Sequence, residues 1–182
     1  MAYSTMSQLH MLSRDSPAAV EWGQRALAIA EPLDLTETLV HALNNVGTAE
    51  MQMGDFGGRA KLERSLELAL AHGMHEHAGR AYINLAYHAL VVRDYDRVRQ
   101  ILADGLGYMR DRDLDLWTMY ALTERARAHL EQGLWREAGD DASAVLAGAP
   151  AAISRLVAAV VLGCVRMRQG DPEAGPLAGG GG

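Results

Sequence analysis

Several features that define common protein classes are missing from this sequence of 182 residues. It has one cysteine, Cys164, which excludes an internal disulfide and fits a reducing cytoplasm. Its amino terminus has no basic segment followed by an apolar run, as a secretory signal requires. The longest uninterrupted apolar run, residues 156–165, is too short to cross a bilayer and is typical of a buried helix. We therefore expect a cytoplasmic protein that does not bind membranes.

Positive charge is also scarce, and arginine carries almost all of it. The chain has 17 basic and 23 acidic residues, which gives a net charge of −6. Only Lys61 is lysine, and together with abundant alanine and glycine this bias is typical of a GC-rich bacterial genome. A nucleic-acid-binding domain would need a basic stripe, so we expect no direct binding of nucleic acid.

What the sequence does contain is one helical pattern that recurs along the chain. Its clearest copy is residues 43–56, the back half of an amphipathic helix that ends in a Gly-Asp-aromatic turn. Five such turns follow one another at steps of 40, 39, 40 and 37 residues, and a small residue stands eight positions before each turn centre. Small residues at these positions let a neighbouring helix approach closely. The turn centres are Asp15, Asp55, Asp94, Leu134 and Asp171, and the small residues are Ser7, Gly47, Ala86, Ala126 and Gly163.

Recurrence at a fixed period of tens of residues is typical of stacked repeat proteins, and no strand alternation competes with it. Nine helices are predicted, at residues 2–13, 17–31, 36–53, 59–71, 76–92, 95–110, 114–132, 136–146 and 152–169. Ser16 is the predicted cap of the second helix. We expect one domain over residues 1–171 and a glycine-rich, disordered tail at 172–182, where four terminal glycines disfavour a tenth helix.

The turns and the residues after them resemble tetratricopeptide (TPR) repeats, which consist of a helix, a tight turn and a second helix. Tyr95 and Trp135 match the aromatic residue after the turn, with Val98 and Ala138 three positions further on. The period of about forty is longer than the usual length of about thirty-four. The resemblance implies an all-α fold, a right-handed α-α superhelix of about four and a half hairpins. Because neither end carries a polar cap, we also expect a homo-oligomer formed through uncapped ends.

The stretch from Thr38 to Ala147 is also similar to the helical-repeat region of large bacterial LuxR-type transcriptional regulators, which are ATP-dependent and maltose-regulator-like. The segments that carry this similarity are residues 42–47, 62–69, 80–86 and 142–146. Such regulators have an NTPase module before the repeats and a helix-turn-helix domain after them, and this chain contains neither. The resemblance implies a module that senses a signal in transcription regulation.

Three motifs hint at chemistry, but each lacks a partner that the chemistry requires. The histidines of residues 72–77 share one loop, and ligands so close rarely converge on a metal without a distant partner. The aspartates of residues 111–115 lack the glycine and glutamate of a calcium loop. Asp55-Phe56-Gly57 matches a kinase magnesium motif without the catalytic loop. We expect no catalytic residue, metal or cofactor, and we expect Cys164 to be buried and inert.

The expected binding surface lies on the first helix of each hairpin, which lines the concave side of TPR-like solenoids. Hydroxyl, amide and guanidinium groups on this face suit a peptide backbone or a small polar ligand. We therefore predict a protein segment or a small-molecule effector as the partner. An ordinary solvated face, or a self-assembling scaffold of stacked repeats, is the alternative. The predicted site residues are His41, Asn44, Thr48, Arg80, Asn84, Tyr87, Tyr120, Thr123, Arg127 and Glu131.

Overall fold

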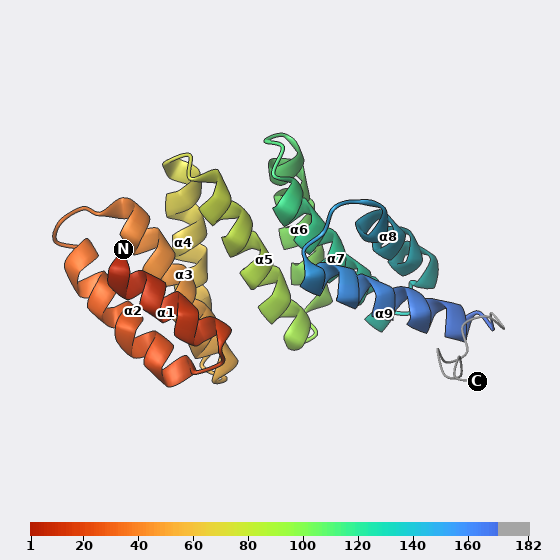
Figure 1. The fold of residues 1–182 in the computed structure, drawn as a ribbon, viewed down its shortest axis with the longest axis horizontal. Coiled ribbons are helices and arrows are strands. Elements are labelled where there is room, and N and C mark those ends of the chain that lie inside the picture. The colour runs from red at the N-terminus through yellow and green to blue at the C-terminus, as the bar shows by residue number, and fades with distance from the viewer. Residues whose placement is uncertain (171–182) are drawn as a thin grey trace, which may run out of the picture. The chain divides into compact units, whose positions relative to one another are not determined.

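The computed structural model describes residues 1–170, and within that range the chain forms nine α-helices and no strand (Figure 1). Every predicted helix is present, with ends within one or two residues of those expected. The predicted tail at 172–182 lies outside the described residues. The helices are α1 (Ala2–Leu12), α2 (Ser16–Ala30), α3 (Thr36–Gln52), α4 (Gly58–Ala71), α5 (His75–Val91), α6 (Tyr95–Arg110), α7 (Asp115–Glu131), α8 (Trp135–Ala147) and α9 (Ala152–Arg168).

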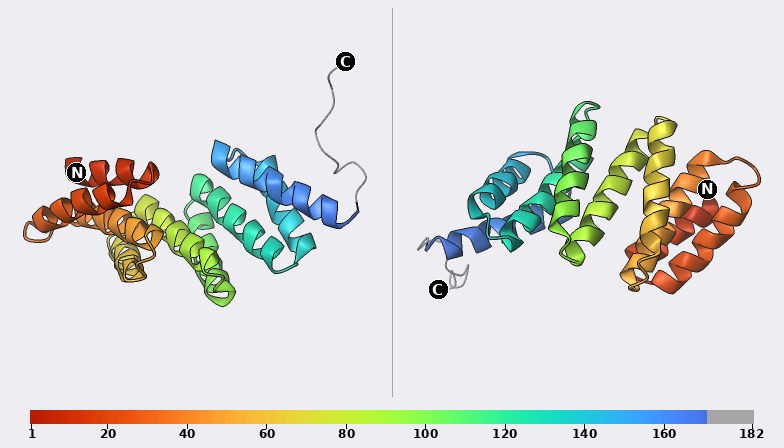
Figure 2. Two further views of the ribbon diagram at one scale, coloured as in Figure 1. Left: turned by 90° about the horizontal axis from the view of Figure 1, so that it is seen from below. Right: turned by 180° about the vertical axis from the view of Figure 1, so that it is seen from behind.

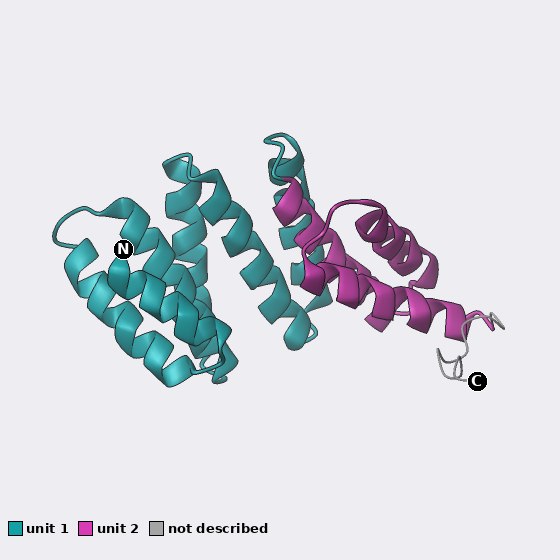
Figure 3. Cartoon of the chain, in the orientation of Figure 1, with its two compact units in different colours: residues 1–114 teal, residues 115–182 magenta. Residues whose placement is uncertain are grey.

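The chain divides into two compact units, Met1–Leu114 and Asp115–Gly182 (Figure 3). Unit 1 contains α1 to α6 and unit 2 contains α7 to α9. Within each unit, consecutive helices pack side by side and run in opposite directions (Figure 2). A single domain over residues 1–171 therefore stays a prediction. None of the described helices is long and apolar enough to span a membrane.

Left-handed backbone geometry ends the first helix of each repeat. The φ angle is positive at the first residue of every predicted turn, for example 84° at Gly54 and 59° at Arg93. After Gly54, the Asp55 amide donates a hydrogen bond to the carbonyl oxygen of Glu50 at 3.0 Å, which closes the helix in the manner of a Schellman motif. The five positions are Arg14, Gly54, Arg93, Gly133 and Gly170. The first residue of each predicted turn therefore has the same left-handed backbone conformation, and the rest of the fifth turn lies outside the described residues.

The predicted cap of α2 is wrong by one residue. The Asp15 carboxylate, and not the Ser16 hydroxyl, accepts a hydrogen bond from the amide of Ala18 at 3.4 Å. Ser16 is buried instead, and its hydroxyl donates to the side-chain oxygen of Gln52 at 2.8 Å. A carboxylate also suits the positive end of a helix dipole, which favours Asp15 in this competition.

The core of unit 1 is centred on α3, which packs against α1, α2, α4 and α5. Twelve of its 17 residues are buried. A Cβ atom built on Gly47 would lie 2.6 Å from the backbone oxygen of Gly58, so α4 approaches α3 more closely than any side chain would permit. The prediction that Gly47 admits a neighbouring helix is confirmed.

Four of the five small residues predicted to face a neighbouring helix are buried, and Gly163 on α9 differs. Ser7, Ala86 and Ala126 have no exposed surface. Gly163 is half-buried, and a Cβ atom built there meets no described atom within 4 Å. Cys164, next to it, is half-buried as well and is not the buried thiol that we predicted. No described helix packs over this side of α9, which explains both differences.

Polar bonds to backbone carbonyls join the helices of unit 1 across its aliphatic core. The Ser7 hydroxyl donates to the carbonyl oxygen of Ala19 at 2.7 Å, and the Ser65 hydroxyl donates to that of Val40 at 2.9 Å. The Asn45 amide donates to the carbonyl oxygen of Ser4 at 3.0 Å. Each bond satisfies a buried group and links two different helices.

In unit 2, a carboxylate on α8 joins α8 to α7. The Asp141 side chain is 7% exposed and accepts two hydrogen bonds from the Arg125 guanidinium, at 2.9 and 2.6 Å. The Nδ1 atom of His129 lies 3.1 Å from the same carboxylate. Bidentate pairing of this kind fixes the relative position of two helices as well as adding stability.

Candidate functional site

The ten predicted site residues fall into three groups by exposure. His41, Asn44, Thr48 and Thr123 are buried, and Glu131 is exposed. Six of the ten lie in unit 1 and four in unit 2. The half-buried residues are Arg80, Asn84, Tyr87, Tyr120 and Arg127.

The three predicted residues of α3 lie inside unit 1 and do not form an open wall. His41 is 5% exposed because α1 packs across α3, and its Nδ1 atom lies 3.1 Å from the hydroxyl oxygen of Ser4. Thr48 is 4% exposed, because α3 is covered by the four helices around it. The sequence could not show this burial, since it depends on where α1 packs. These side chains therefore pack between helices of unit 1.

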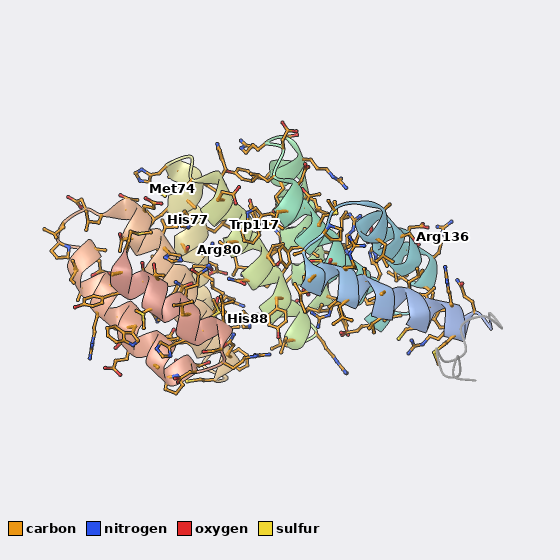
Figure 4. All side chains as sticks on the ribbon, in the orientation of Figure 1. Met74, His77, Arg80, His88, Trp117 and Arg136 are labelled. Carbon is orange, nitrogen blue, oxygen red and sulfur yellow. The ribbon has the colours of Figure 1, made fainter. Side chains whose placement is uncertain are left out.

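Polar groups with partial access to solvent remain on α5. Arg80, Asn84 and Tyr87 lie at helical spacing on one side of this helix, and all three are half-buried. The Asn84 amide donates to the side-chain oxygen of Asn44 on α3 at 2.9 Å, so the first helices of two successive repeats are linked directly. Burial lowers the pKa of the Arg80 guanidinium, and the charge of Glu76 opposes this change. Figure 4 shows Arg80 on α5 between the labelled residues His77 and His88.

Two imidazoles stand beside Arg80 at the amino-terminal end of α5. The rings of His41 and His77 meet edge to face, with centroids 5.7 Å apart. Burial, followed by the charges of Arg80, His77 and the chain's amino terminus, lowers the pKa of His41 to about 4. Burial and then Arg80 also lower the pKa of His77, whose Nε2 atom lies 3.7 Å from Glu37. Both imidazoles are therefore neutral near neutral pH, and the cluster gains positive charge when it is acidified.

Unit 1 is expected to lose stability in acid because it buries neutral histidines. Burial also lowers the pKa of His88 to about 4, with a contribution from Arg14. Between an unfolded pKa of about 6.5 and the folded value of about 4, the unfolded chain binds protons that the folded chain does not. Stability is therefore complete above that window and falls as the pH drops through it, by roughly 2 to 3 kcal/mol per histidine at about pH 4.5.

Urea unfolding followed by circular dichroism from neutral pH down through this window measures the effect. The loss should shrink in His41→Gln and His88→Gln, because each variant lacks one titrating group. His72→Gln is the matched control, since His72 is exposed in the turn after α4. Equal pH dependence in all three variants would contradict the assignment.

The four predicted residues of unit 2 lie on α7 and already have partners within the unit. The Arg127 guanidinium donates to Glu124 at 2.7 Å, and burial raises the pKa of Glu124 although Arg127 lowers it. The Thr123 hydroxyl donates to the backbone oxygen of Met119 at 2.7 Å. The Tyr120 ring lies against Trp117, with centroids 5.7 Å apart. This surface offers an aromatic pair beside an ion pair, a combination suited to a peptide or a small ring-containing ligand.

The structure also places the histidine motif and the kinase-like tripeptide that were identified in the sequence. His75 and His77 face different partners, because the Nδ1 atom of His75 lies 2.6 Å from the hydroxyl of Tyr108. Among residues 1–170, no group of three or more histidine, cysteine, aspartate or glutamate side chains is placed to hold a metal. Asp55, of the kinase-like tripeptide, accepts a hydrogen bond from the amide of Gly57 at 2.9 Å and so forms part of the repeat turn.

Two recurring features define the class of fold. The helices form antiparallel hairpins, and the first helix of each repeat ends in a left-handed residue and carries a small residue eight positions before the turn centre. The chain is an all-α, TPR-like helical-repeat solenoid. The crystal structure of a kinesin light chain with nearly identical TPR-like repeats, from Podospora anserina, matches it with a TM-score of 0.70, over 95% of this chain and 88% of that chain. At 18% sequence identity, this likeness shows the fold. No family model and no curated protein matches the chain.

Proposed function

We propose that the chain is a non-catalytic binding module whose partner is a protein segment or a small-molecule effector. The observation that carries this proposal is the row of half-buried polar groups on α5, Arg80, Asn84 and Tyr87, tied to α3 through the Asn84–Asn44 bond. A guanidinium, an amide and a phenol on a rigid helix can pair with the donors and acceptors of a peptide backbone. Tyr120, Thr123, Arg127 and Glu131 make up a second row on α7 in unit 2.

The finer proposal is that this module is the sensing part of a cytoplasmic LuxR-type bacterial regulator. It rests on the resembling segments of the sequence, of which residues 80–86 include two members of the α5 row. In such a regulator, the repeats receive a signal and other modules bind ATP and DNA. The genomic sequence around the coding region tests this, because an NTPase module upstream and a helix-turn-helix domain downstream in one reading frame are expected.

Removing two arginines from the proposed rows is expected to weaken ligand binding about tenfold or more while leaving the fold intact. The variant is Arg80→Ala with Arg127→Ala, and the probes are peptides selected by phage display against the native chain. Affinity is measured by isothermal titration calorimetry, and thermal denaturation reports the fold. The matched control is Arg64→Ala with Arg99→Ala, because these exposed arginines pair with Glu67 and Asp96 of their own helices. An unchanged affinity in the first variant would remove both side chains from the site.

A self-assembling scaffold is the second candidate, and the end helices of the described chain favour it. On α1, Leu9 is 56% exposed and Leu12 is 66% exposed, and α9 carries a comparable apolar face. Exposed apolar surface of this kind often marks an interface. Sedimentation over a range of concentrations separates the two candidates, because a scaffold sediments as a growing series of assemblies.

A further inference from the structure

The helix α9 is buried on one face only. It packs on α7 and α8 through Ser154, Ala158, Val161 and Val165, which are buried. On the other face, Leu156 is 61% exposed, Val160 57% and Met167 67%, and Gly163 lies between them on the same side. Within residues 1–170 no atom occupies the space that a Cβ of Gly163 would contact.

The repeat pattern shows what fits such a face, because Gly163 is the equivalent of Gly47. In the α3–α4 hairpin, the backbone of α4 reaches Gly47 at Gly58. Three residues after Gly47, the Glu50 carboxylate accepts a hydrogen bond from Lys61 of α4 at 2.8 Å. Lys61 follows Gly58 by three residues. The second helix of this hairpin, α4, therefore places a small residue against Gly47 and, three residues later, a positive charge against Glu50.

The α7–α8 hairpin has a similar arrangement, with the carboxylate on the second helix. Here Ala126 is the small residue of α7, and His129 follows it by three positions. His129 lies 3.1 Å from Asp141 of α8, which follows the fully buried Ala138 by three positions. In the α5–α6 hairpin the equivalent position is Ala89, which carries no charge. In the α1–α2 hairpin the equivalent residue is His10, whose Nδ1 atom lies 3.2 Å from the carboxylate of Asp15, just before α2. Two of the four described hairpins, α3–α4 and α7–α8, therefore pair the ionisable residue three positions after the small one with a residue of the second helix.

On α9 the residue at this position is Arg166. All the charged side chains of α9 are basic. Arg155, Arg166 and Arg168 are exposed, and α9 contains no aspartate or glutamate. No salt bridge joins any of these three arginines to another group in the part of the chain that the structure describes. Charge complementarity therefore calls for a carboxylate on whatever covers this face.

A hollow beside the same face provides room for apolar side chains. It has a volume of about 300 Å³ and lies between α7 and α9. Leu156, Val160 and Val161 line it from α9, and Leu130 lines it from α7, flanked by Arg127 and Glu131. Apolar anchors entering such a hollow, with a charged pair at its edge, are how an amphipathic helix binds to a helical surface.

We propose that the exposed face of α9 is a docking site for an amphipathic, acidic helix of a partner protein. That helix places a small residue against Gly163 and an aspartate or glutamate, three residues later, against Arg166. The chain's own residues at the equivalent distances are Leu177 and Ala178, so its sequence offers no carboxylate there. The proposal does not rest on the α5 row, and it shares with the α7 row only Arg127 and Glu131, which line the hollow.

A peptide with the sequence of α4 tests the proposal, because α4 is the helix that fits the equivalent face of α3. The probe is a fluorescent peptide of residues 57–72 carrying Lys61→Glu, with a hydrocarbon staple joining positions 60 and 64, which face away from α3 and are exposed. The staple is needed because so short a helix is marginal in water. The full chain is expected to bind this peptide about fivefold or more tightly than the matched peptide with native Lys61, as measured by fluorescence anisotropy.

Two variants of the protein complete the test. Arg166→Glu should reverse the preference, so that the native Lys61 peptide binds more tightly. Gly163→Trp should abolish binding of both peptides without lowering the melting temperature, because a Cβ atom at this position meets no described atom within 4 Å and the side chain leaves the helix on its exposed face. Failure of both peptides to bind the native chain, equal affinity for the two, or no reversal in Arg166→Glu would overturn the proposal. A dimer that disappears in Leu156→Glu would assign the face to a second copy instead.

Discussion

Gly47→Ala is expected to lower the free energy of unfolding of unit 1 by at least about 2 kcal/mol, although alanine is the better helix former. The added Cβ would lie 2.6 Å from the backbone oxygen of Gly58, 3.0 Å from Leu62 Cγ and 3.1 Å from the Leu62 amide nitrogen. Two of these three atoms belong to the backbone, so no change of rotamer relieves the overlap. The α3–α4 pair must move apart, and the core around Leu62, which has no exposed surface, loses its packing.

The same substitution at the equivalent position of α9 is the control, and its effect should have the opposite sign. Gly163→Ala introduces a Cβ that meets no described atom within 4 Å. The helix then gains roughly 0.5 to 1 kcal/mol from the lower conformational freedom of alanine. Thermal and urea denaturation, followed by circular dichroism, measure both variants. A change of the same sign in the two would mean that close helix approach does not explain the small residue of the repeat.

Asp141→Ala is expected to destabilise unit 2 by about 2 to 3 kcal/mol. The substitution removes both hydrogen bonds of the Arg125 guanidinium and the contact of His129, and it leaves two ionisable groups facing an apolar surface. The Arg125 and His129 side chains are 34% and 24% exposed, so partial rehydration keeps the loss below that of a fully buried pair. The bond to Asp141 also raises the pKa of Arg125, as expected for a favourable pair.

Asp140→Ala is the matched control for this prediction, because Asp140 is the exposed neighbour on the same helix and should change stability by less than about 0.5 kcal/mol. The double variant Arg125→Ala with Asp141→Ala should lose less than the sum of the single variants, by about 1 kcal/mol or more. Strict additivity in urea denaturation would show that the α7–α8 bridge contributes nothing to stability.

The sequence predicted the hairpins well because their signals are local. Each hairpin is marked by a left-handed residue at a helix end and by a small residue eight positions before the turn centre. Both signals act within one or two turns of helix, and they recur at a near-constant period. Gly54 and Gly47 carry both signals in the clearest repeat, and the structure gives each the role that was predicted.

Exposure was harder to predict because it depends on which helices cover a face. His41 and Thr48 have the residue types of a binding wall, yet α1 and the surrounding helices bury them. Trp135, which matches the aromatic residue after the turn, is 39% exposed, and Phe56, the aromatic residue of the clearest turn, is 64% exposed. The role proposed for Arg166 depends on the pairs that Glu50 and His129 form with a second helix, and sequence alone does not show those pairs.

The serine and asparagine bonds inside unit 1 have a consequence for how such a chain grows. An aliphatic seam of alanine and valine resists separation, but it tolerates rotation of a helix about its axis. A hydrogen bond to one backbone carbonyl of the neighbouring helix fixes the rotation of that helix about its axis. Such bonds come from Ser7, Ser65 and Asn45. Duplication of one of these hairpins in the gene would copy its polar residue as well. The added helix would then pack with the same rotation about its axis, without further substitutions elsewhere in the protein.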